Sequence, residues 1–127
     1  MSLQDYFENT DGIGILATAD SNGFVNTAVY SRPHFINEKN CIFLMSDKRS
    51  HRNILENPHS SYIFIEQSEH YEGKRLYLTK TKELEDAAFA KKLRRKKHGN
   101  TAHEKGEYKK TFAVYFRVDS VRALVGD

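Results

Sequence analysis

The residues best suited to do chemistry follow one short apolar segment of the chain. After Cys41–Met45 comes a polar turn rich in hydroxyls and cations: Ser46, Lys48, Arg49, Ser50, His51 and Arg52. A short helix is predicted next, and it ends at Asn57-Pro58 because proline disfavours helix in the residue before it. Cations, hydroxyls and backbone N–H groups at a helix start suit a phosphate. The turn predicts a phosphate-bearing ligand, with an ordinary solvated turn as the alternative.

Other sequence patterns for catalysis or metal binding are missing. The six histidines (34, 51, 59, 70, 98 and 103) include no pair with the helical spacing of a zinc protease, and one cysteine cannot form a thiolate zinc site. There is no nucleophile elbow, Walker loop or dinucleotide fingerprint. The lone Cys41 lies in an apolar segment, which favours a buried thiol. We therefore predict no metal site, leave the catalytic residues unassigned, and expect a bound cofactor to supply any chemistry.

Length and composition predict one globular domain over residues 1–127. Hydrophobic residues make up 39% and charged residues 29%, and no apolar run approaches the roughly 20 residues that span a bilayer. The N-terminus lacks a signal-peptide pattern, and the single cysteine suits a reducing cytoplasm, so we expect a cytoplasmic protein without a membrane partner. Residues 91–97 (KKLRRKK) carry six cations, which fit a nucleic-acid patch or, as we favour, the exposed end of a helix.

The order of the predicted elements points to a mainly β fold with accessory helices. A short helix that Ser2 could cap comes first. Strand-forming runs between turn signals predict six strands over residues 13–19, 24–31, 41–45, 60–66, 74–80 and 111–124, with a turn at 20–23 between the first two. Residues 83–97 are predicted to be helical, with an apolar stripe of Leu84, Ala88, Phe89 and Leu93. Residues 98–110 are predicted to be a polar loop. Six short strands indicate a closed or half-closed antiparallel barrel.

The whole chain resembles the pyridoxamine 5′-phosphate oxidase-like FMN-binding split barrels. The resemblance rests on the order of four segments: GIGILATADSNGFVNTAVYS, IFLMSDKRSHRNILENPHSSYIFIE, GKRLYLTK and FAVYFRVDSVRALVGD. It implies a six-stranded antiparallel split β-barrel, FMN as the cofactor and a homodimer that holds FMN at its interface. It also implies a flavoprotein that acts as an oxidoreductase or in electron transfer. F420 and haem, which similar barrels hold, stay open as alternatives to FMN.

The resemblance also implies which residues contact the cofactor. The strand Asn26, Thr27, Ala28 and Val29 corresponds to the one that lines the isoalloxazine ring, and Met45 and Ser46 lie by the ring and ribityl chain. The turn Arg49, Ser50 and His51, with Asn53 on the following helix, corresponds to the phosphate-binding turn. Tyr71, Arg75 and Tyr77 could approach the flavin from the partner subunit, although a surface cation and packed aromatic rings are the favoured interpretation of these three.

Two departures from the family pattern bear on activity. Ser50 stands where many relatives have a lysine, so Arg49 and backbone N–H groups would supply more of the charge. Nothing after Asp127 corresponds to the segment that binds pyridoxal phosphate in the true oxidase, so we expect no pyridoxamine phosphate oxidase activity. The substrate and the electron donor stay unassigned. The alternative function is a non-enzymatic module whose basic residues 91–97 bind nucleic acid or another anionic partner.

Overall fold

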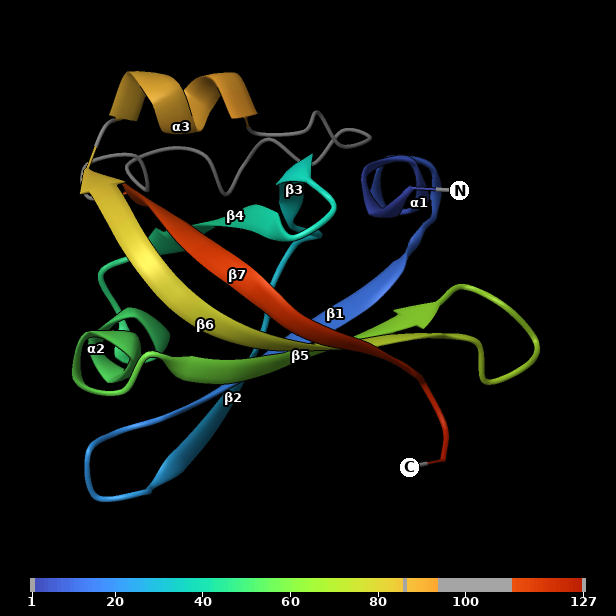
Figure 1. Cartoon of the computed structure of the whole chain (residues 1–127), viewed down its shortest axis with the longest axis horizontal. Helices are drawn as coiled ribbons and strands as arrows, with labels where there is room; N and C mark the ends of the chain where they lie inside the picture. Colours follow the sequence, from blue (N-terminus) through green and yellow to red (C-terminus); the bar gives the residue numbers. More distant parts are fainter. Residues whose placement is uncertain (1, 86, 94–110, 127) are drawn as a thin grey trace.

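The computed structural model describes residues 2–85, 87–93 and 111–126. Within them, three helices accompany a seven-stranded sheet (Figure 1). The helices are α1 (Leu3–Asn9), α2 (Arg49–Glu56) and α3 (Ala87–Leu93). The strands are β1 (Gly12–Ala19), β2 (Val25–Val29), β3 (His34–Asn37), β4 (Asn40–Ser46), β5 (His59–Glu66), β6 (Gly73–Glu85) and β7 (Thr111–Ala123). None of the helices in these ranges is long and apolar enough to cross a membrane.

All strand pairs are antiparallel, in the order β2-β1-β5-β6-β7-β4-β3. The hairpin of β1 and β2 closes at a turn in which Gly23 has a φ of 86°, a conformation that glycine adopts without steric cost. The β6 and β7 strands each have 13 residues and bend along their length, so the sheet curls around its inner face (Figure 1). The curl brings the end of β4 and the start of α2 close to β2.

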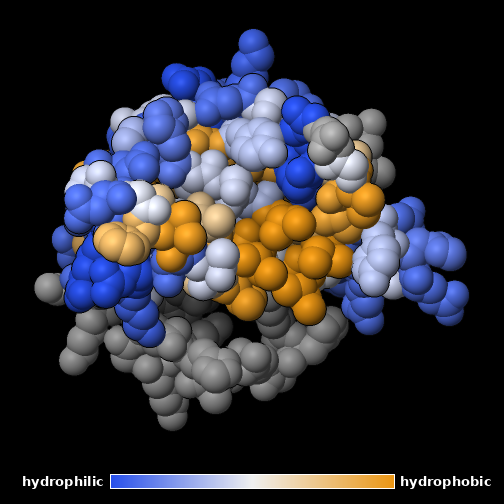
Figure 2. All heavy atoms as spheres, turned by 90° about the horizontal axis from the view of Figure 1, so that it is seen from below, coloured by the Kyte–Doolittle hydropathy of each residue, from blue (hydrophilic) through white to orange (hydrophobic). Residues whose placement is uncertain are grey.

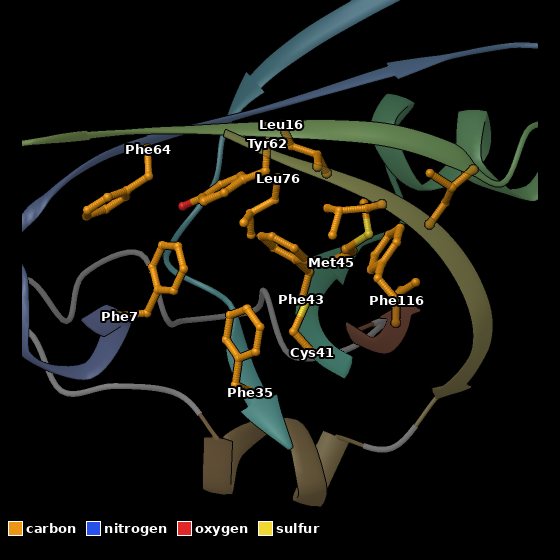
Figure 3. Packing of buried hydrophobic residues seen from close by; sticks show 13 residues of the cluster. Phe7, Leu16, Phe35, Cys41, Phe43, Met45, Tyr62, Phe64, Leu76 and Phe116 are labelled. Carbon is orange, nitrogen blue, oxygen red and sulfur yellow. The ribbon is translucent and has the colours of Figure 1, made fainter. Parts of the chain in front are cut away.

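The inner face of the curled sheet holds an aromatic core. Phe43 of β4 lies edge-on to Tyr62 of β5, with ring centroids 4.9 Å apart, and to Phe116 of β7 at 5.6 Å. Figure 3 shows Phe43 and Phe116, which come from the paired strands β4 and β7, together with Tyr62 from β5 in one cluster. Phe7 of α1 stacks on Phe35 of β3 at 5.5 Å. Such pairs contribute about 0.5–1.5 kcal/mol each beyond their buried area. The helix α1 therefore closes one end of the barrel.

The first helix and the first turn form as the sequence predicts. The Ser2 hydroxyl accepts a hydrogen bond of 3.1 Å from the Asp5 N–H, so Ser2 caps α1. The strand count is different, because the prediction of six strands missed β3. This strand has four residues, directly follows Pro33 and pairs only with β4, so no alternating pattern marks it in the sequence. The mainly β prediction is confirmed, with seven strands in one curled sheet.

The predicted helix over residues 83–97 is wrong at its start. Residues Glu83 to Glu85 belong to β6 and pair with β7 as far as Glu85 opposite Phe112. Leu84 is 45% exposed and does not begin an apolar stripe. Pairing with a strand that lies far away in the sequence outweighs the helical preference of KELE. The helix α3 begins at Ala87, and residues 94–97 and the predicted loop 98–110 lie outside the described residues.

Candidate functional site

A pocket of about 350 Å³ opens between β2, the end of β4 and the start of α2. Its volume lies within the range of small-molecule sites. One wall comes from the second strand and the opposite side from the turn that leads into α2. The residues that line it are Asn26, Ala28, Val29, Tyr30, Ser31, Leu44, Ser46, Lys48, Arg49, Ser50 and Thr111. This combines a short apolar wall with two cations and several hydroxyls.

The wall from β2 owes its direction to strand alternation. Asn26 pairs with Thr18 of β1, and Ala28 pairs with Leu16. Thr18 and Leu16 are buried on the inner face, so Asn26 and Ala28 lie on the face of β2 that is turned toward α2. Thr27 lies on the opposite, exposed face. The end of β2 therefore presents an amide and a methyl group toward the pocket.

Tyr30, which follows β2, is fixed by the neighbouring strands. Its backbone N–H donates to the Gly14 carbonyl at 2.9 Å, and its carbonyl accepts a 3.1 Å hydrogen bond from the Tyr62 hydroxyl. A Cβ atom at position 14 would overlap the Tyr62 side chain. Burial raises the pKa of the Tyr30 phenol, and a hydrogen bond with Ser50 partly offsets this effect. Tyr30 therefore places a protonated phenol in the wall of the pocket.

The opposite side of the pocket is the first turn of α2. Lys48 occupies the N-cap position without a side-chain cap hydrogen bond, and the helix begins at Arg49. Both cations are exposed, whereas Ser50 is only 3% exposed and lies 3.5 Å from the Asn26 amide nitrogen. A helix start carries partial positive charge and N–H groups that are not used within the helix. This end of the pocket therefore suits an anion.

Six of the ten predicted cofactor contacts line this pocket: Asn26, Ala28, Val29, Ser46, Arg49 and Ser50. The other four lie elsewhere. Thr27 is on the outer face of β2, and Met45 is buried in the aromatic core. Asn53 is buried and donates 3.1 Å to the Thr18 hydroxyl, which ties α2 to β1. His51 is buried beside Phe112 and Glu83. Contact with a cofactor stays a prediction for all ten residues.

Five lining residues are missing from the predicted contacts. Lys48 is part of the singled-out turn, and Ser31 follows the second strand, so position alone could have included both. Tyr30 and Leu44 look like ordinary core residues in the sequence. Thr111 joins the pocket because β7 pairs with β4, which places it opposite Ser46. Only the strand register reveals this long-range contact.

The three residues that could approach a flavin from a partner subunit, Tyr71, Arg75 and Tyr77, do not line this pocket. The Arg75 guanidinium donates to the backbone carbonyls of Ala123, at 2.7 Å, and Gly126, at 2.5 Å. Tyr71 is 86% exposed, and Tyr77 is partly exposed on β6. Of the basic segment 91–97, only its first three residues are described, in α3. Among the described residues, no three His, Cys, Asp or Glu side chains form a possible metal site.

Known structures share this architecture over nearly the whole chain. An FMN-binding protein from Syntrophomonas wolfei subsp. wolfei has a TM-score of 0.76 at 18% identity, over 98% of this chain and 84% of that one. The chain has the fold of the FMN-binding split barrels. An F420 reductase matches this split barrel with a TM-score of 0.70 at 16% identity, over 95% of this chain and 97% of that one.

A third split barrel comes from Clostridium acetobutylicum. It is related to general stress protein 26, of the pyridoxinephosphate oxidase family, and has a TM-score of 0.67 at 16% identity, over 95% of this chain and 87% of that one. No family model and no curated protein matches the sequence. At these identities the likeness establishes the fold alone.

Proposed function

We propose that this split barrel belongs to the pyridoxamine 5′-phosphate oxidase-like family and binds FMN in the pocket between β2 and α2. The observation that carries the proposal is the composition of one pocket end. There, Lys48, Arg49 and the buried Ser50 hydroxyl lie at the start of α2, a helix without a side-chain cap. A phosphate monoester carries nearly two negative charges at pH 7 and is bound well by a guanidinium together with N–H donors.

The remaining lining residues suit the rest of a flavin nucleotide. Ser46 and Thr111 provide hydroxyls beside the cationic end, where a ribityl chain could accept and donate hydrogen bonds. Ala28 and Leu44 provide apolar contact for a ring system, and Asn26 provides an amide for its polar edge. A bound flavin accepts and returns electrons or a hydride. We therefore propose an oxidoreductase or electron-transfer protein whose own residues hold and orient the cofactor.

We also propose that two copies form a homodimer through the outer face of β1, β2 and β5. Figure 2 shows apolar side chains gathered on the underside of the molecule, where these strands lie in Figure 1. Val25, Val29 and Ile13 are 80%, 75% and 59% exposed, and strand register places Ile15 and Ile63 on the same face. These side chains gather into one apolar patch on a single face of the sheet, whereas exposed apolar residues on a monomer are usually scattered. A two-fold contact between two copies would cover the patch.

The purified protein tests which cofactor it takes. It is denatured, and the released small molecule is identified by absorbance and mass. The protein freed of cofactor is then titrated with FMN, F420 and haem in parallel. The proposal expects FMN in the extract and tighter binding of FMN than of the other two. Preferential binding of F420 or haem, or no saturable FMN binding, would contradict it.

A further inference from the structure

His51 lies at the centre of a small buried cluster beneath the first turn of α2. Its ring is 3% exposed and stacks on Phe112 of β7, with centroids 4.0 Å apart and planes 15° apart. Its Nε2 atom lies 3.0 and 3.2 Å from the two carboxylate oxygens of Glu83 on β6. A carboxylate only accepts hydrogen bonds, so Nε2 carries a hydrogen and donates it to Glu83. The imidazole therefore joins the helix α2 to the strands β6 and β7.

The charged groups around this ring come from three elements. Asp47, just before α2, lies 3.5 Å from the Nδ1 atom of His51 and 4.0 Å from Arg52. Glu83 also pairs with Lys80 at 2.8 Å. Burial raises the pKa of the Glu83 carboxyl, but the hydrogen bonds and charges of Lys80 and His51 outweigh it, so the pKa lies below its ordinary value. Glu83 is therefore the ionised acceptor that holds Nε2.

This cluster anchors a helix start that has no side-chain cap. Lys48 gives α2 no side-chain cap hydrogen bond, so no capping side chain holds the first N–H groups of the helix. Arg49 and Ser50, the two residues just before His51, line the pocket, whereas His51 itself does not. The first turn is thus held from beneath by the imidazole, and its opposite side is presented to the ligand.

Building on the proposed function, we propose that His51 is a positioning residue for the anion-binding turn, acting through its bond to Glu83 and its stack on Phe112. The bond and the stack fix the rotation of the first turn of α2. They thereby keep the Arg49 guanidinium and the Ser50 hydroxyl directed at a phosphate. His51 does not have to contact the ligand to affect its affinity, and the effect should be confined to ligands that carry a phosphate.

The test compares His51→Leu with His51→Gln, whose terminal amide can replace the Nε2 donor. Each is titrated with FMN and with riboflavin, which lacks the phosphate. His51→Leu should weaken FMN binding about tenfold, equivalent to ~1.4 kcal/mol, and change riboflavin binding by less than about twofold. His51→Gln should recover most of the FMN affinity. Equal losses for both ligands in His51→Leu, or no recovery in His51→Gln, would overturn the proposal.

Hydrogen exchange separates this inference from FMN binding itself. In wild type, the Arg52 amide donates to the Lys48 carbonyl at 3.0 Å, so its exchange rate reports on the first turn of α2. Glu83→Gln removes the charged acceptor but keeps the side-chain size, and it should speed exchange there about tenfold with little change in β1. Unchanged exchange would overturn the inference even in a protein that binds FMN. Faster exchange would support the anchoring role even where wild type binds no FMN.

Discussion

The hydroxyl of Tyr62 lies against Gly14 and donates a 3.1 Å hydrogen bond to the carbonyl of Tyr30. Three strands meet at this point, because Gly14 is in β1, Tyr62 is in β5 and Tyr30 follows β2. The contact exists only because position 14 has no side chain. It fixes the backbone of a residue that lines the pocket, so the packing of the sheet and the shape of the pocket share one constraint.

Gly14→Ala should destabilise the protein, because the new methyl group overlaps the Tyr62 side chain. An overpacked core site typically costs about 1–3 kcal/mol. Urea unfolding followed by circular dichroism measures the change. Tyr62→Phe is the matched variant: it keeps the ring and loses only the hydrogen bond, for a cost of about 1 kcal/mol. A Gly14→Ala protein with the wild-type midpoint would show that Tyr62 moves aside freely.

Arg49→Ala should weaken FMN binding by about 1.5–3 kcal/mol, the scale of a charge-assisted hydrogen bond. Riboflavin affinity should change far less. Quenching of flavin fluorescence measures both. Arg52→Ala is the control, because Arg52 is a neighbouring cation that pairs loosely with Asp47 and does not line the pocket. If Arg52→Ala weakened FMN binding as much as Arg49→Ala, general surface charge would explain the affinity.

Cys41 should be unreactive in the folded protein. Its side chain is fully buried in β4, and burial raises the pKa of the thiol to about 12, so almost no thiolate exists at pH 8. A colorimetric thiol reagent should therefore react within minutes in denaturant and far more slowly without it. Rapid native labelling would mean that β4 opens readily, and comparing labelling at two reagent concentrations would distinguish such opening from direct access.

Acid should weaken the fold through Glu83. Because the pKa of Glu83 in the folded state lies below its ordinary 4.5, the ionised carboxylate stabilises the fold above that pH. This contribution is lost as the pH falls below about 4.5 and through the lower folded-state pKa. The difference between the unfolding midpoint at pH 6 and that at pH 3 should thus be smaller in Glu83→Gln than in wild type. A variant with the wild-type difference would mean that other carboxylates account for the acid sensitivity.

The proposed homodimer predicts a mass of about twice 14.7 kDa by light scattering. Val25→Asp and Ile13→Asp place a charge on the exposed outer face and should shift the mass toward the monomer, since an unpaired charge is costly in an interface. Ile36→Asp on β3 is the control, because Ile36 is also exposed but lies at the other edge of the sheet. Dimers that survive both outer-face variants would require a different interface.

Local patterns in the sequence were sufficient for most of the fold. Short strand-forming runs predict β1, β2, β4, β5 and β7 with small errors at their ends, and the composition of residues 20–23 predicts the first turn. The long-range contacts were less accessible. The β6 strand continues through Glu85 because β7 pairs with it, and nothing within KTKELE signals that pairing. The four residues of β3 are too few to show a period.

The candidate site divides in the same way. Its cationic turn can be predicted from composition, since Lys48, Arg49 and Ser50 gather at a predicted helix start. The direction of each side chain cannot be predicted in this way, because it depends on which face of α2 meets the sheet. In the sequence, His51 looks as suited to a phosphate-binding turn as its neighbours, but its ring stacks on Phe112. Tyr30 packs against the core, edge-on to Phe43, as its type suggests, and it also lines the pocket, which its type does not signal.

The strand order has a consequence for synthesis on the ribosome. In the sheet, β3 and β4 join the other strands only through β7, which is the last of the described strands along the chain. A nascent polypeptide that has exposed β1, β2, β5 and β6 can form that half of the sheet, while the β3–β4 hairpin still lacks its neighbour. The pocket needs Leu44 and Thr111 from the late half. Any small molecule that it holds must therefore be acquired after translation has passed β7.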